Sequence, residues 1–174
     1  MFFAKPGIYE PCGIFSITHI IVLVICLVLI GIFVYKIRNI TAKKLNLITR
    51  IIAIVIVFLE TGKIVFSFVN HQTNLDSWVP LYFCSMFIFA TILSGYAKGW
   101  LKSLADAFIG SGGIIAGAMF LIMPSTSLTI YPMFHYLSCY SMLYHSLMVF
   151  LGMGYLLNGI VVLNKSCLLY TSPS

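Results

Sequence analysis

The segment from Tyr131 to His145 carries the densest set of side chains that can do chemistry. It contains His135, Cys139, Ser141 and His145, together with several tyrosines. On a helix, Cys139 lies one turn after His135, and Ser141 lies one turn before His145. Imidazole groups transfer protons or bind metal ions, and a thiol beside an imidazole can act as a nucleophile. Any one of these residues is typical of packing, but the set together indicates a candidate site.

A second polar group lies within the apolar stretch 51–69 and just after it. At about 100° per residue, Glu60, Lys63, Ser67 and His71 fall on one narrow stripe of a helix. A charge at the centre of a membrane helix costs about 2.5–3.5 kcal/mol, so this stripe must face protein or water. Two interpretations stay open: an i,i+3 ion pair that locks two helices together, or the lining of a cavity.

His19 is the notable polar residue of the first apolar stretch. It shares a helical face with Cys12, Ser16 and Cys26. A lone histidine inside a membrane is more often a hydrogen-bonded packing residue than a catalytic one.

A stripe of small residues follows Asp106 at helical spacing. Gly110, Gly113 and Gly117 lie on the same face as Asp106, and small residues let a neighbouring helix approach closely. We interpret this stripe as a packing surface and expect Asp106 to pair with Lys98 or Lys102.

The elements that must position these residues follow from composition. Of the 174 residues 61% are hydrophobic and only 8% are charged, and the mean hydropathy is +1.07. A membrane-spanning helix needs about 20 mainly apolar residues. Five segments meet or approach this length, which predicts an all-α polytopic transmembrane helix bundle: residues 14–35, 51–69, 80–97, 104–123 and 132–163.

The ends of the chain lead to further expectations. We expect a single transmembrane domain over residues 1–166, no cleaved signal peptide, and a non-native or disordered tail over residues 167–174. Such a tail predicts a chain truncated at its C-terminus. If the last apolar stretch were wholly helical it would be about 50 Å long, so its beginning must break or extend into the interface.

The positive charges predict an orientation, because short loops rich in Lys and Arg stay in the cytoplasm. Lys5 stands alone on one side, and the other side carries eight basic residues: Lys36, Arg38, Lys43, Lys44, Arg50, Lys98, Lys102 and Lys165. This predicts a multi-pass protein of the cell membrane with its N-terminus outside and its C-terminus in the cytoplasm. The net charge of +6 then requires no nucleic acid partner.

With that orientation, the polar residues gather toward the outside. Six of them fall at the outer ends or outer halves of their helices: His19, Asn70, His71, Cys84, His135 and His145. We therefore expect one outward-facing site. The five cysteines show no CxxC pair, and we predict no cofactor. A metal site built from His19, His71, Cys84, His135 and His145 is a weaker alternative, because no two histidines have i,i+4 spacing.

Three short motifs resemble the YwaF-like integral membrane family. They are Phe15-Ser16-Ile17-Thr18-His19-Ile20, Val79-Pro80-Leu81-Tyr82-Phe83-Cys84-Ser85, and the segment from Pro132 to His145. Their order matches, as does a glycine-rich helix over 110–117 that ends in Pro124, so the resemblance covers roughly residues 10–155. Ser125 departs from the family pattern, which has an acidic residue there, and family members generally continue with a further helix.

That family is similar to eukaryotic multispanning acyltransferases that move fatty acyl chains onto ether lysophospholipids. The resemblance implies that Cys84 takes the acyl group as a thioester, with His135 or His145 as general base and His19 as an orienting partner. Membrane lipids, and a phospholipid or lysophospholipid substrate, are the implied partners. A transporter or a non-enzymatic protein that binds a small solute or ion is the alternative, based on the stripe of Glu60 and Lys63. The oligomeric state is left open.

Overall fold

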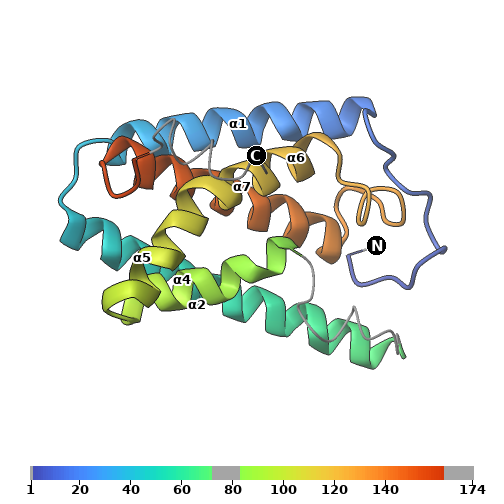
Figure 1. Cartoon of the computed structure of the whole chain (residues 1–174). Helices are drawn as coiled ribbons and strands as arrows, with labels where there is room; N and C mark the ends of the chain where they lie inside the picture. Colours follow the sequence, from blue (N-terminus) through green and yellow to red (C-terminus); the bar gives the residue numbers. More distant parts are fainter. Residues whose placement is uncertain (1, 72–82, 163–174) are drawn as a thin grey trace, which may run out of the picture.

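The computed structural model describes residues 2–71 and 83–162, and all regular secondary structure in these residues is helical. The α-helices are α1 (Ile17–Ile37), α2 (Ala42–Val69), α4 (Met86–Tyr96), α5 (Gly99–Phe108), α6 (Ile114–Ile122) and α7 (Tyr136–Leu157) (Figure 1). A 3-10 turn at Phe83–Ser85 leads into α4, and a π-helical turn at Ile109–Gly113 joins α5 to α6. The predicted helical bundle is therefore confirmed.

Four of these helices are long and apolar enough to cross a membrane: α1, α2, the continuous helix Gly99–Ile122, and α7. The helix Phe83–Tyr96 is apolar but shorter. It lies between α2 and α5 and packs against both. These lengths and compositions define a multi-pass membrane protein.

Helix α7 forms the centre of the bundle. It packs against α1, α2 and α6, and its residues Met148, Leu151 and Tyr155 belong to the main apolar core. Helix α1 lies at the periphery, alongside α7 (Figure 1), and buries only His19, Ile30 and Val34. Its remaining apolar side chains therefore suit contact with lipid.

Helix α2 begins nine residues earlier than the predicted start at residue 51. Thr41 caps it, because its hydroxyl accepts a hydrogen bond from the Lys44 amide. Lys43, Lys44 and Arg50 are thus helical residues rather than part of a basic loop. Hydropathy placed the boundary too late, since long basic side chains can extend to the interface while their backbone stays helical.

The other boundaries also shift. Only Ala97 and Lys98 separate α4 from α5, so the helix predicted at 104–123 begins at Gly99. The predicted final helix, 132–163, is helical from Tyr136 to Leu157, so its beginning does break, as expected from its length. Residues 80–82, residue 163 and the predicted tail 167–174 lie outside the described residues.

Glycines set the distance between α7 and the continuous helix Gly99–Ile122. A Cβ on Gly117 would lie 2.9 Å from the His145 carbonyl oxygen, and one on Gly152 would lie 2.7 Å from the Ile109 carbonyl oxygen. A backbone carbonyl cannot move aside as a flexible side chain can. The close approach of these helices therefore requires glycine at both positions, which supports the packing role expected for the small-residue stripe.

We predict that Gly152→Ala lowers stability by about 1–3 kcal/mol through overpacking. Gly31→Ala on α1 is the matched control, because nothing lies within 4 Å of its added Cβ. Alanine is also the better helix former, so this control should be neutral or slightly stabilising. Thermal unfolding in detergent measures both variants. Equal unfolding midpoints for the two would contradict the role of Gly152.

Candidate functional site

Five helix ends meet on one side of the bundle, which we call the histidine end. Helices α1 and α7 and the helix Phe83–Tyr96 begin there, while α2 and α6 end there. The N-terminal segment covers this end (Figure 1). It is held by backbone hydrogen bonds from the Cys12 amide to the Tyr131 carbonyl and from the Tyr136 amide to the Phe2 carbonyl. His19 and His135 both lie at this end of the bundle.

His19 uses both of its ring nitrogens to bind backbone. Its Nδ1 accepts from the Phe15 amide at 3.1 Å, so Nε2 carries the proton and donates to the Leu121 carbonyl at 3.0 Å. The bond to Phe15 also holds that residue in a left-handed conformation, with φ of 60°. His19 therefore ties the start of α1 to the end of α6, as expected for a hydrogen-bonded packing residue.

His135 caps α7 and is also fully engaged. Its Nδ1 accepts from the Leu137 amide at 3.2 Å, and its Nε2 donates to the Ala4 carbonyl at 3.1 Å. The ring stacks on Tyr131, with centroids 4.1 Å apart. Burial lowers the pKa of His135 from its ordinary value, so the ring stays neutral at pH 7.

His145 differs from the other two histidines. Its Nδ1 lies 2.7 Å from the Ser141 carbonyl, which can only accept, so Nδ1 carries the proton. In the described part of the chain, the buried Nε2 has no hydrogen-bond partner. The ring stacks on Phe120 of α6 at a centroid distance of 3.7 Å. His145 thus presents a free lone pair inside the bundle.

Cys84 lies in the 3-10 turn at the start of the helix Phe83–Tyr96. Its thiol is half-buried and free, and its carbonyl accepts a hydrogen bond from the Tyr144 hydroxyl at 3.0 Å. Lys63 and Tyr140 are close enough to Cys84 to interact with it electrostatically. Among the described residues, no hydrogen bond joins the thiol to His19, His135 or His145.

Glu60 and Lys63 form the expected i,i+3 ion pair on α2, with 2.6 Å between Lys63 Nζ and Glu60 Oε1. The other carboxylate oxygen of Glu60 accepts from the Tyr140 hydroxyl of α7. Lys63 Nζ also lies 5.9 Å from the centroid of the Tyr140 ring. The pair therefore links α2 to α7, as the first of the two interpretations expected. We call Glu60, Lys63, Tyr140 and Tyr144 the tyrosine cluster.

The remaining members of the predicted stripe are placed differently. Ser67 is buried on α2, whereas His71 lies beyond the end of the helix, is exposed and has φ of 55°. A cavity lined by all four residues stays a prediction. The tyrosines were not assigned a role from the sequence, although Tyr136, Tyr140 and Tyr144 recur every four residues and so share a face of α7.

A second buried network lies toward the opposite end of the bundle. Lys102 binds both carboxylate oxygens of Asp106, at 2.7 and 3.0 Å, and Ser94 donates to Asp106 at 2.6 Å. The Tyr155 hydroxyl lies 2.6 Å from Ser94 Oγ and 2.8 Å from Thr49 Oγ1. The expected partner of Asp106 is therefore Lys102. The hydroxyl groups of Thr49, Ser94 and Tyr155 come from three helices. They extend the Lys102–Asp106 pair into the core as a hydrogen-bonded network.

The metal hypothesis receives no support from the geometry. Residues 2–71 and 83–162 contain no group of three or more His, Cys, Asp or Glu side chains placed to hold a metal ion. Two of the proposed ligands, His19 and His135, already bind backbone through both ring nitrogens.

The fold and the buried polar residues define a polytopic helical membrane protein in which several buried polar side chains form hydrogen bonds between helices. The particular family follows from comparison with known proteins. A family model described as the TMEM164 family matches residues 14–169, so the chain belongs to the TMEM164 family, a multispan membrane family. No curated protein and no solved structure matches the chain. The YwaF-like resemblance and the similarity to acyltransferases stay predictions.

We predict that Lys63→Met lowers stability by on the order of 3 kcal/mol, because it leaves the Glu60 carboxylate buried without its cation. The double variant with Glu60→Gln should recover most of this loss, since an amide needs no counter-ion and can still accept from Tyr140. Thermal unfolding of the single and double variants in detergent gives the coupling free energy between Glu60 and Lys63. A double variant that loses the sum of the two single effects would refute the ion pair as a stabilising contact.

Proposed function

We propose that this protein transfers acyl chains between phospholipids, with Cys84 as the nucleophile. The observation that carries the proposal is the position of Cys84. A half-buried free thiol lies next to the tyrosine cluster, within an otherwise apolar set of helices. A cysteine in apolar surroundings is inert unless a neighbouring group stabilises its thiolate. The Lys63 ammonium lies within electrostatic reach and can supply part of that stabilisation.

The reaction would proceed in two balanced steps. In the first, a base takes the Cys84 proton, and the thiolate attacks the ester carbonyl carbon of a donor phospholipid. The ester C–O bond breaks, the acyl group remains as a thioester, and the departing lysophospholipid oxygen receives the proton. In the second, the hydroxyl of an acceptor lysophospholipid gives its proton to the base and attacks the thioester, which restores the thiol.

His145 is our proposed general base. Of the three histidines suggested by the sequence, it has a ring nitrogen whose lone pair is free, at Nε2. It follows Tyr144, whose hydroxyl donates to the Cys84 carbonyl, so it is adjacent in the chain to a direct contact with the turn that carries the thiol. His135 and His19 are proposed as positioning residues, because they fix the N-terminal segment and the end of α6 around the site.

The test uses purified protein in liposomes that contain a phospholipid with a labelled acyl chain and an unlabelled lysophospholipid acceptor. We expect wild type to label the acceptor and Cys84→Ala to fall to background. His145→Gln should slow transfer by about 10²–10⁴-fold, the usual contribution of a general base. Cys12→Ala is the matched control and should retain activity. Absence of transfer by wild type would reject the reaction, and transfer by Cys84→Ala would reject the nucleophile.

Transport of protons or small ions is the second candidate function. It is favoured by one observation, the Glu60–Lys63 ion pair inside a membrane-spanning helix. The same liposomes, loaded with a pH-sensitive dye, distinguish it from acyl transfer. A proton flux that Glu60→Gln abolishes would support transport, and an impermeable liposome would exclude proton transport.

We also propose that the histidine end faces outward. Its support is the distribution of charge, because Lys36, Arg38, Lys43, Lys44, Lys98 and Lys102 all lie toward the opposite end. We predict that, with the native cysteines replaced by alanine, a membrane-impermeant maleimide labels Lys5→Cys in intact cells and leaves Lys98→Cys unlabelled until the cells are opened. Both positions are exposed in the structure. The reverse labelling pattern would show the opposite orientation.

A further inference from the structure

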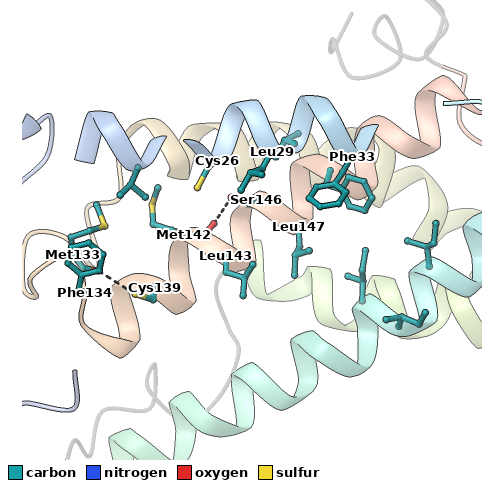
Figure 2. A pocket seen from close by; sticks show the side chains of 16 residues that line it. Cys26, Leu29, Phe33, Met133, Phe134, Cys139, Met142, Leu143, Ser146 and Leu147 are labelled. Carbon is teal, nitrogen blue, oxygen red and sulfur yellow. Dashed lines mark hydrogen bonds between the residues drawn. The ribbon is translucent and has the colours of Figure 1, made fainter. Parts of the chain in front are cut away.

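An apolar groove runs between α1, α2 and α7. Figure 2 shows Cys26, Leu29 and Phe33 of α1 on one side of it and Met142, Leu143 and Leu147 of α7 on the other. Ile48, Ile51 and Ile52 of α2 complete it. The groove has a volume of about 570 Å³. Its α7 lining residues Cys139, Met142 and Ser146 lie on a different face of α7 from Tyr140 and Tyr144, which contact Glu60 and Cys84.

The side-chain hydrogen-bond donors of α7 that line the groove already donate to backbone carbonyls. Ser146 donates its hydroxyl to the Met142 carbonyl at 2.7 Å, and the Cys139 thiol donates to the Met133 carbonyl at 3.5 Å (Figure 2). No charged side chain is among the residues that line the groove. Its surface therefore suits a hydrocarbon occupant and offers nothing to a polar solute.

The dimensions of the groove limit what can fill it. Along α1 it extends from Val22 to Phe33, which is about 16 Å at 1.5 Å per residue. That length is close to half the roughly 30 Å hydrocarbon core of a bilayer, so it suits one extended acyl chain from a single leaflet.

We propose that this groove binds one acyl chain of a membrane phospholipid. Lys44 supports a phospholipid rather than a free hydrocarbon, because it precedes Ile48 by one turn of α2 and so places an ammonium beyond the end of the groove. That position suits the phosphate of the same lipid. The bound chain joins α1 to α2 and α7 through van der Waals contacts. The inference goes beyond acyl transfer, because the groove and Cys84 use different faces of α7.

Lipid tails are as apolar as the lining, so selective binding must come from the match of shape. A chain long enough to occupy the full groove should therefore bind, while a short-chain phospholipid with the same headgroup should not. This difference separates binding in the groove from general solvation by the bilayer. Because the two lipids share a headgroup, the comparison also distinguishes binding of the acyl chain from contact of the headgroup with Lys44.

The first experiment places the full chain in detergent with a phosphatidylcholine that carries a photoactivatable diazirine in the middle of one acyl chain. We expect covalent label on α1 and α7 residues of the groove. Leu143→Trp, which fills the groove, should reduce this label by about tenfold, which corresponds to about 1.4 kcal/mol. Leu104→Trp is the matched control on an exposed position of α5, outside the groove, and should leave the label unchanged.

A second measurement uses the unmodified protein, so it tests the proposal even if Leu143→Trp does not fold. Cys139 lines the groove, whereas Cys12 does not. Phosphatidylcholine with long chains should slow alkylation of Cys139 by a maleimide about tenfold, and dihexanoyl phosphatidylcholine should not, with Cys12 as the internal reference. Equal alkylation of Cys139 in both lipids would overturn the proposal. Label spread evenly over the exposed helices, or crosslinks from the groove to a second copy of the chain, would also overturn it.

Discussion

Inside a bilayer little water is available to satisfy a polar group, so a polar group without a partner in the protein is costly. Among the described residues, α7 makes several of those pairings. Tyr140 binds Glu60 of α2, Tyr144 binds the carbonyl of Cys84, and Tyr155 joins Thr49 to Ser94. Each tyrosine hydroxyl thus fastens α7 to another helix at a different depth. The geometry of the candidate site depends on these contacts, because they fix which residues of α2 and α4 face α7.

Three faces of α7 make different kinds of contact. One face carries the tyrosines and the core residues Met148 and Leu151. A second approaches α6 closely at Gly152 and opposite Gly117, where His145 also stacks on Phe120. The third lines the apolar groove against α1. The contacts of Tyr140 and Tyr144 and the apolar groove thus lie mainly along different stripes of α7.

The histidines illustrate how context decides the chemistry of a side chain. His19, His135 and His145 are all buried, yet two of them spend both ring nitrogens on backbone groups at the histidine end. Those two hold the N-terminal segment and the end of α6 in place. His145 binds backbone through one nitrogen only, which leaves it able to accept a proton. Burial alone therefore does not identify a general base. The hydrogen-bond partner of each ring nitrogen shows whether that nitrogen can accept a proton.

The sequence by itself determined the class of the molecule, because membrane helices are encoded by local runs of apolar residues about 20 long. It also indicated pairs within one helix, since three or four residues return to the same helical face: Glu60 with Lys63, and Asp106 with Lys98 or Lys102, of which the structure selects Lys102. The tertiary structure decided everything that depends on contacts between helices. The bond of Tyr140 to Glu60, the backbone partners of His19 and His135, and the groove between α1, α2 and α7 each join residues far apart in the chain. No local pattern specifies which apolar helices become neighbours, because all of them are compatible with lipid.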